Sequence, residues 1–338
     1  MKKNVERCGG RFTTMFAEKY FSEHEQFIQD NLVMECIVGS QAYGCNTVDS
    51  DFDFIGIVMD PHQQLYPQNY GHVLGFDKQP TFTSRECKGK DKRLLTESMK
   101  EVEGCWYSLT NFFQLAGLQG SPNLVELLFV RRPLVTYGTN IAWMLRDNRK
   151  LFLSMKSFSA LKGYLNSQLI RVLKEAARWH KEGKCDNSTR RHFYESRGYD
   201  CKMAYHPLRL TDILHQMLTQ DDIDLMRNNE ECKRMRAGEW GTLKEFEDTV
   251  KRRLEALEIL AMSPKNPLPT TPNKDALKKL LNSCVEEWYG SEGNKNKLTE
   301  EYISVKDVFN MQLELKKILS DQLKNQPHRP FMIATGSY

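Results

Sequence analysis

The alternation of apolar and polar residues near the N-terminal end predicts two neighbouring strands and a tight turn. Residues 32–40, LVMECIVGS, are almost all apolar, partly β-branched and end in a Gly-Ser pair, which is typical of a buried strand that leads into a turn. Residues 51–59, DFDFIGIVM, alternate Asp51 and Asp53 with two phenylalanines. Because strand side chains point alternately to the two faces, we expect both carboxylates on one face and both rings in the core.

Helical periodicity dominates the second half of the chain. Apolar residues recur at helical spacing over residues 155–182, 199–219, 243–262, 274–289 and 303–324, and an earlier helix is predicted over 12–30. A proline-rich linker, residues 263–273, ends the helix before it. The pattern predicts an α+β protein with a small mixed sheet within residues 1–150, a helical domain over 151–290, and a C-terminal helix with a flexible tail over 291–338.

The turn and the paired carboxylates indicate a site for a polyphosphate and metal ions. Gly39 allows close approach of the backbone to a ligand, Ser40 adds a hydroxyl, and a short helix is expected to follow, whose first amides favour an anion such as a triphosphate. Asp51 and Asp53 repel one another, so a pair of divalent cations is the natural neutraliser. Mg²⁺ prefers carboxylates and substrate phosphates, and two ions clamp an in-line displacement at phosphorus. An Asp-rich turn is the structural alternative.

A third carboxylate is expected from residues 98–109, SMKEVEGCWYSL. Glu101 and Glu103 lie two apart and share a face if this segment is extended, and Glu103 is the preferred metal ligand. The alternative is a solvated strand face. A polar segment, residues 60–93, separates the Asp strand from the Glu strand, so the sequence leaves the pairing of these strands open.

Composition favours an enzyme of a reducing compartment. The 338 residues include nine cysteines without any C-x-x-C pair, which argues against a disulfide framework. Cys185 near His180 and His192 is interpreted as a set of scattered surface residues rather than a zinc site. The first residues lack an apolar signal core and no apolar run reaches 18 residues, so a cytoplasmic protein is expected.

Positive charge is concentrated in residues 171–209. This segment has ten Lys or Arg against five Asp or Glu, a local charge of +5, whereas the whole chain is only +4. Such a region attracts a polyanion, and Arg190, Arg191 and Arg197 are the predicted RNA-binding residues. Four aromatic residues in it, Trp179, Phe193, Tyr194 and Tyr199, favour stacking with bases. The alternative interpretation is an ordinary solvated helix surface.

One helix face in the basic region is polar and cationic. Lys202, His206 and Arg209 follow at i, i+4 and i+7 of the predicted helix 199–219. Burying such a face is costly, so it is expected to face water or to meet an anion. Asp200 just before it is interpreted as the N-cap.

Taken with three later segments, the Gly-Ser turn followed by Ser-Asp-x-Asp resembles a known family. The segments are WYSLTNFFQLAGLQGSPNLVELL at 106–128, GYDCKMAYHPLRL at 198–210 and NPLPTTPNKDALKKLL at 266–281. Together they resemble the RNA-repair-associated (RlaP-like) nucleotidyltransferases of the DNA polymerase β-type superfamily, often encoded near RNA ligases and in phage or bacterial genomes. The family's Gly-Asn-Pro-Asn reads Gly120-Ser121-Pro122-Asn123 here, a mild change at a turn.

The resemblance implies a palm-like sheet and transfer of a nucleoside monophosphate from a nucleoside triphosphate to an acceptor hydroxyl, preferably an RNA end. It implies two Mg²⁺ or Mn²⁺ ions and a functional association with an RNA ligase. The implied site residues are Asp51, Asp53 and Glu103 as metal ligands, and Gly39, Ser40, Ser50, Lys202, His206 and Arg209 around the nucleotide. There are two alternatives: the acceptor is a hydroxyl of a protein or a small molecule, or the protein is a nonenzymatic RNA-binding accessory. The carboxylates argue against the accessory, because a protein that only binds a polyanion gains nothing from them.

Overall fold

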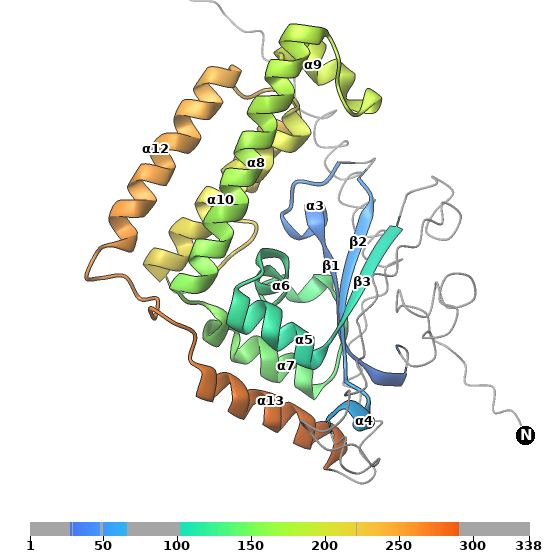
Figure 1. Cartoon of the computed structure of the whole chain (residues 1–338). Coiled ribbons are helices and arrows are strands. Elements are labelled where there is room, and N and C mark those ends of the chain that lie inside the picture. The colour runs from blue at the N-terminus through green and yellow to red at the C-terminus, as the bar shows by residue number, and fades with distance from the viewer. Residues whose placement is uncertain (1–27, 29, 48–49, 66–101, 221, 291–338) are drawn as a thin grey trace, which may run out of the picture.

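In the computed structural model, the N-terminal half of the chain contributes a four-stranded mixed sheet (Figure 1). The structure describes residues 28, 30–47, 50–65, 102–220 and 222–290. The strands are β1 (Leu32–Val38), β2 (Phe52–Val58), β3 (Val102–Ser108) and β4 (Val135–Gly138), in the order β3-β2-β1-β4. β1 pairs antiparallel with β2 and β4, whereas β2 and β3 are parallel. The predicted α+β class is confirmed.

The strand register brings the predicted site residues to one end of the sheet. Val38, the last residue of β1, is opposite Asp53, and Asp53 is opposite Glu103 in the parallel pair. The pairing that the sequence left open is therefore made directly. The phenylalanines on either side of Asp53 are at most 1% exposed, so the predicted alternation across β2 is confirmed.

Helices follow the sheet in sequence and dominate the rest of the fold. The α-helices are α3 (Gly39–Ala42), α4 (His62–Leu65), α5 (Leu109–Phe112), α6 (Pro122–Leu127), α7 (Asn140–Asp147), α8 (Met155–Glu182), α9 (Arg191–Arg197), α10 (Cys201–Gln220), α11 (Asn229–Arg236), α12 (Leu243–Ala261) and α13 (Lys274–Tyr289). One π-helical segment, η2 (Phe113–Gln119), and the 3₁₀ turns η3 (Arg132–Leu134), η4 (Arg149–Phe152) and η5 (Ser188–Arg190) lie between them. Predicted helices 155–182, 199–219, 243–262 and 274–289 are confirmed as α8, α10, α12 and α13. Most of predicted helix 12–30 and all of 303–324 lie outside the described residues.

Local capping explains where the long helices begin and end. Ser154 and Ser157 form a reciprocal capping box at the start of α8, and Gly183 ends the helix with a φ of 65°. Thr242 and Glu245 form the same box at the start of α12. These hydrogen bonds satisfy backbone groups that a helix end otherwise leaves open.

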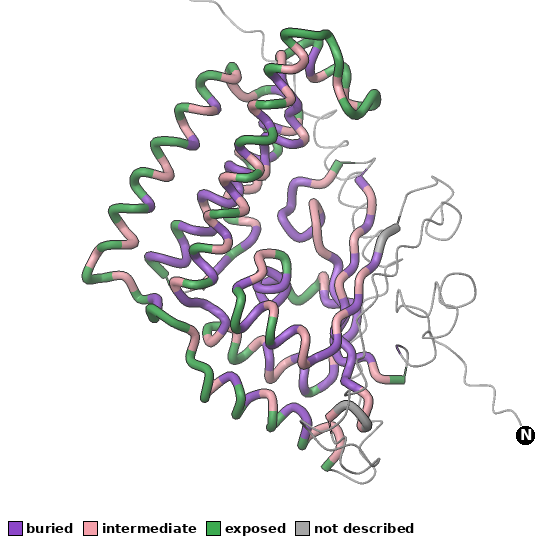
Figure 2. Tube along the Cα trace, viewed as in Figure 1, coloured by how far each residue is buried: buried purple, intermediate pink, exposed green. Residues whose placement is uncertain are grey.

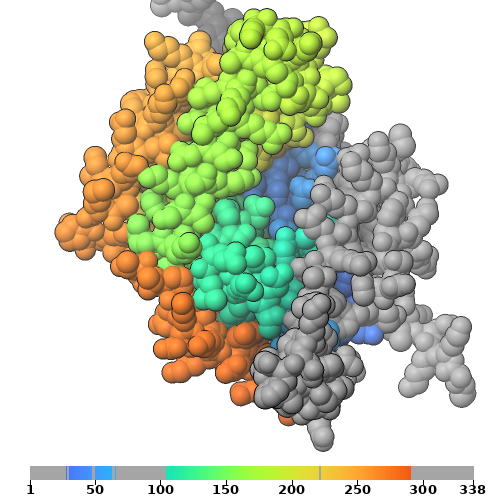
Figure 3. Space-filling model, in the orientation of Figure 1, coloured from blue at the N-terminus to red at the C-terminus, as the bar shows by residue number. Residues whose placement is uncertain are grey.

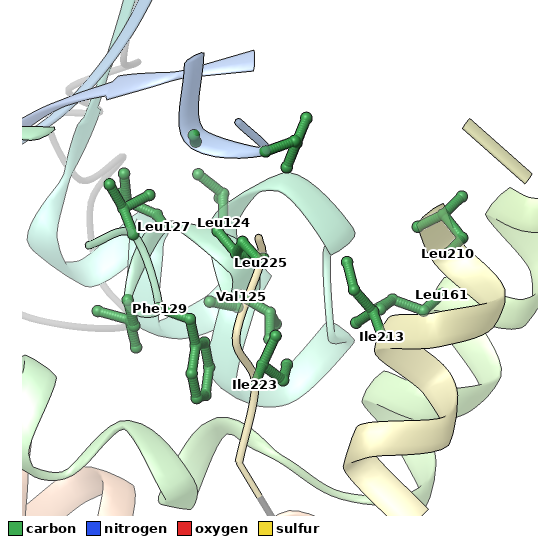
Figure 4. Packing of buried hydrophobic residues seen from close by; sticks show 14 of the residues in the cluster. Leu124, Val125, Leu127, Phe129, Leu161, Leu210, Ile213, Ile223 and Leu225 are labelled. Carbon is green, nitrogen blue, oxygen red and sulfur yellow. The ribbon is translucent and has the colours of Figure 1, made fainter. Parts of the chain in front are cut away.

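A continuous hydrophobic core joins the sheet to the helices (Figure 2). Side chains of α6 and of the residues just after it pack against residues of the 222–225 segment, and α8 and α10 contribute further apolar side chains close by (Figure 4). The labelled members are Leu124, Val125, Leu127, Phe129, Leu161, Leu210, Ile213, Ile223 and Leu225. This core crosses residue 150, and the domain boundary there stays a prediction. Within the described part of the chain, no helix is long and apolar enough to cross a membrane.

Candidate active site

The turn after β1 is held in a conformation that glycine favours. Gly39 has a φ of +64°, and a Cβ built there would collide with the carboxylate of Asp53, whose Cγ would be 3.2 Å away. The Tyr43 N–H donates to the Gly39 carbonyl at 3.3 Å, and the Cys45 N–H donates to the Ser40 carbonyl at 3.1 Å. These bonds form α3, the short helix expected after the turn. The turn backbone therefore lies directly against one of the two predicted catalytic carboxylates.

Asp51 and Asp53 both line a cavity at this end of the sheet. Neither is fully buried, so their oxygens are accessible from the cavity. Glu103 is opposite Asp53 in the backbone register, but its side chain lies outside what the structure describes. Among the described side chains, no group of three or more His, Cys, Asp and Glu is gathered as a metal site. The role of Glu103 as the third ligand stays a prediction.

The cavity has a volume of about 410 Å³ and lies between the sheet and the helices. Figure 3 shows the blue atoms of the N-terminal strands recessed beside the helical segments. Its wall includes Val38, Gly39, Ser40, Ala42, Tyr43, Ser50, Asp51, Asp53, Phe54, Ile55, Gly104, Cys105, Tyr107, Asn123, Glu126, Leu127, Val130, Tyr164, Lys202, Tyr205, His206, Arg209, Leu225 and Arg236. All six residues predicted to surround the nucleotide therefore line this one cavity.

Cationic side chains from α10 and α11 form part of the cavity wall. Lys202 makes no hydrogen bond or ion pair with any described residue. Arg236 donates to the Ser50 hydroxyl at 3.3 Å and lies 5.1 Å from the centre of the Tyr205 ring. Burial first, and the nearby charges of Arg209, Arg236, Arg190 and Lys202 next, together lower the pKa of His206 to about 3. Among the described groups, the Lys202 and Arg236 charges have no carboxylate partner, so the wall favours an anion.

Arg209 lines the same cavity but already has a counter-ion. Its Nη1 donates to Glu126 Oε2 at 2.7 Å, and its guanidinium carbon is 3.7 Å from the centre of the Tyr43 ring. Burial acts to lower the pKa of Arg209, but the Glu126 carboxylate outweighs it and holds that pKa above its ordinary value. The sequence reasoning expected this helix face to meet water or an anion. At Arg209 the face does meet an anion, but this anion is the Glu126 carboxylate of the protein itself.

Ser50 and Asp200 have local structural contacts. The Ser50 hydroxyl accepts from the Thr47 N–H at 2.8 Å and so closes the turn that leads to Asp51. Asp200 accepts from the Met203 N–H at 3.0 Å, so its predicted role as N-cap of the helix is confirmed. Arg190 donates to the other Asp200 oxygen at 3.0 Å.

The three predicted RNA-binding arginines lie outside the cavity wall. Arg190 is bound to the buried Asp200, Arg191 is exposed and pairs with Glu195 at 2.8 Å, and Arg197 is exposed at the end of α9. Two of the aromatic residues predicted to stack with bases are not accessible. Tyr194 is 3% and Tyr199 is 1% exposed, because both pack into the core, so that part of the stacking hypothesis is wrong.

The sequence reasoning missed several residues of the cavity. Glu126 lies within the 106–128 segment that carries the family resemblance, so its position there was an available signal. Tyr43 comes three residues after Ser40 and could have been inferred from the short helix. Arg236 reaches the cavity from a distant helix, and no local pattern indicates it.

Comparison with known protein families matches residues 17–222, well over half of the chain, to the RlaP family, described as an RNA repair pathway DNA polymerase beta family. The match covers the sheet, the turn, the carboxylates and the helix that carries Lys202, His206 and Arg209. A search of curated proteins found no match.

Proposed function

The chain belongs to the RNA repair pathway DNA polymerase beta family, and from this premise we propose that it is a metal-dependent nucleotidyltransferase that adds a nucleoside monophosphate to an RNA end. The family description supports the coarser activity, a polymerase β-type nucleotidyltransferase of RNA repair. The observation that carries the finer proposal is the cavity itself. It brings two carboxylates, a glycine turn and cations without a carboxylate partner among the described residues to one place.

The residues present fit divalent cations. Asp51 and Asp53 are hard oxygen donors at a cavity wall, and the register puts Glu103 beside Asp53 in the sheet. These three residues would hold the ions. When bound, the ions would lower the pKa of the acceptor hydroxyl and neutralise charge at the reacting phosphate.

The other cavity residues would orient the triphosphate. The amides of the Gly39-Ser40 turn and the Ser40 hydroxyl would bind phosphate oxygens beside Asp53. Lys202 and Arg236 would face the β- and γ-phosphates, because both line the same cavity as the carboxylates and have no acidic partner among the described residues. As the acceptor oxygen bonds to the α-phosphorus, the bond to the bridging oxygen breaks and pyrophosphate leaves. The Lys202 and Arg236 side chains would stabilise the negative charge that develops on the leaving pyrophosphate.

The proposed acceptor is an RNA end. The family description and the exposed basic residues of α8 and α9 support this acceptor. A hydroxyl of a protein or a small molecule fits the same chemistry and is the alternative outcome of the acceptor assay. A nonenzymatic RNA-binding accessory is disfavoured, because carboxylates in a polyanion site repel the ligand unless metal ions are bound.

Asp53→Asn tests the proposal most directly. The change removes a charge from the ion site at nearly constant volume, and we expect a loss of roughly a thousandfold or more in rate. The assay supplies each labelled triphosphate with Mg²⁺ or Mn²⁺ and total RNA, lysate protein or small-molecule hydroxyls as acceptors. Asp147→Asn, the same chemical change at an exposed position of α7, is the control. A folded Asp53→Asn protein with activity within tenfold of wild type would contradict the assignment.

A further inference from the structure

Three buried polar side chains from three separate parts of the chain meet beside the Gly39-Ser40 turn. Tyr43 follows α3, Glu126 is on α6 and Arg209 is on α10, and they are 8%, 3% and 3% exposed. The Tyr43 hydroxyl and Arg209 Nη1 both donate to Glu126 Oε2, each at 2.7 Å. The Arg209 guanidinium also stacks on the Tyr43 ring at 3.7 Å. We name these three residues the anchor cluster.

The anchor cluster is expected to add little to the free energy of unfolding. A buried ion pair often adds nothing over apolar residues of the same size, because desolvation cancels the attraction. Glu126 Oε1 and Arg209 Nε are also buried without a hydrogen-bond partner among the described residues. An incomplete network of this kind costs stability. Its directional contacts do, however, define the position of the Tyr43 ring closely.

Tyr43 connects the anchor cluster to the turn. Its N–H donates to the Gly39 carbonyl at 3.3 Å, which ties the residue after α3 to the first residue of that helix. Gly39 in turn lies so close to Asp53 that a Cβ would collide with the carboxylate. A displacement of the Tyr43 ring would therefore move the turn relative to the carboxylate that it faces.

We propose that Glu126 and Arg209 are positioning residues that hold Tyr43, and through it the Gly39-Ser40 turn, where it binds triphosphate, and that Arg209 does not itself contact phosphate. This inference rests on the proposed function for the identity of the ligand. It changes the part expected for Arg209, because Nη1 of its guanidinium donates to Glu126 and the guanidinium carbon lies 3.7 Å from the centre of the Tyr43 ring. Direct phosphate binding from α10 is then left to Lys202 and His206.

Glu126→Gln separates positioning from direct phosphate contact by the sign of its effect. If Arg209 bound phosphate directly, removing its internal counter-ion would strengthen triphosphate binding. If the anchor cluster positions the turn, the loss of a charged hydrogen bond should weaken binding of a nonhydrolysable triphosphate about tenfold or more. Tyr43→Phe removes only one hydroxyl and no charge. Tyr43→Phe should therefore weaken triphosphate binding about threefold, whereas direct phosphate contact by Arg209 predicts no change in that binding. Calorimetry measures both, and unchanged or tighter binding in folded Glu126→Gln protein overturns the proposal.

Amide hydrogen exchange tests the same proposal without a ligand. Glu126→Gln and Tyr43→Phe should speed amide exchange in residues 39–45 more than in the strands of the sheet. Asp222→Asn is the control, because it breaks a two-bond pair with Arg149 away from the cavity. It should leave residues 39–45 unchanged. Unaltered exchange there in Tyr43→Phe, the milder variant, overturns the positioning role. Wild-type protein that binds no triphosphate would contradict the proposed function instead, while the exchange result still decides the role of the anchor cluster.

Discussion

His206 is a residue whose surroundings determine its charge. It lies on the cavity face of α10 between Lys202 and Arg209, and Arg236 and Arg190 approach from α11 and η5. Burial first, and these four cations next, lower the pKa of its imidazole to about 3 from 6.5. His206 is therefore neutral in the free protein at neutral pH, and an anion in the cavity would favour its protonated form.

The folded protein should lose stability through His206 as the pH falls. Between pH 6.5 and about 3 the unfolded chain takes up a proton on His206 that the folded chain does not, so the free energy of unfolding falls as pH falls through this range. His206→Gln removes this dependence. We expect wild type to lose up to about 1.4 kcal/mol per pH unit more than the variant below pH 6.5, with no difference in slope above pH 7. Urea unfolding from pH 4.5 to 8 measures this; parallel curves would contradict the low pKa.

At the scale of elements, the start of α10 depends on Asp200. This carboxylate is 3% exposed, caps the helix through the Met203 N–H and receives a hydrogen bond from Arg190. Arg190 therefore lies in a junction between η5 and α10, although the sequence suggested an RNA contact. Its neighbour Arg191 is 61% exposed in the side chain, pairs with Glu195 on its own helix and lies 5.9 Å from the centre of the Trp179 ring.

Charge reversal should distinguish these two arginines. Arg190→Glu leaves the buried Asp200 carboxylate without its partner and beside a like charge, which should lower the free energy of unfolding by about 3 kcal/mol or more. Arg191→Glu changes an exposed i,i+4 pair and should cost less than about 1 kcal/mol. Urea titration of the two single variants compares them. Equal and small losses would show that the bond between Arg190 and Asp200 does not hold the junction together.

For the whole molecule, many cations of the basic region, residues 171–209, are already paired with carboxylates of the protein. Besides Arg190 and Arg191, Arg178 pairs with Asp186 and Lys184 lies 3.9 Å from Glu182. The net charge still attracts a polyanion, but fewer side chains are available for phosphate contacts. In Figure 1, α9 and α13 lie at opposite ends of the molecule, which permits a control matched in charge.

Arg191→Glu with Arg197→Glu should weaken RNA binding and lower the slope of log affinity against log salt by about two, because each lost phosphate contact removes about one released counterion. Binding of free triphosphate should hardly change, since neither residue lines the cavity. Lys278→Glu with Lys279→Glu on α13 makes the same change in net charge far from α9. If both double variants show the same RNA affinity and slope, the α9 residues do not contact RNA, and a protein or small-molecule acceptor becomes the better proposal.

The sequence by itself determined the features that depend on neighbours in the chain. The alternation in residues 51–59 predicted β2 with Asp53 on the open face, because a strand repeats every two residues. Apolar spacing predicted α8 and α12 almost to the residue, because helical periodicity acts between residues three or four apart. The Gly39 turn and the N-cap role of Asp200 are local in the same sense.

Tertiary structure decided every feature that joins distant parts of the chain. No local pattern could show that Glu103 is opposite Asp53, because strand pairing across a long connection depends on the whole sheet. Glu126 and Arg209 are 83 residues apart, so helical periodicity presented Arg209 only as an open cation. Tyr194 is buried for a similar reason, since the packing of α9 decides which of its sides faces the core. Charge pairing and burial are properties of three-dimensional neighbours, and only the folded chain determines those.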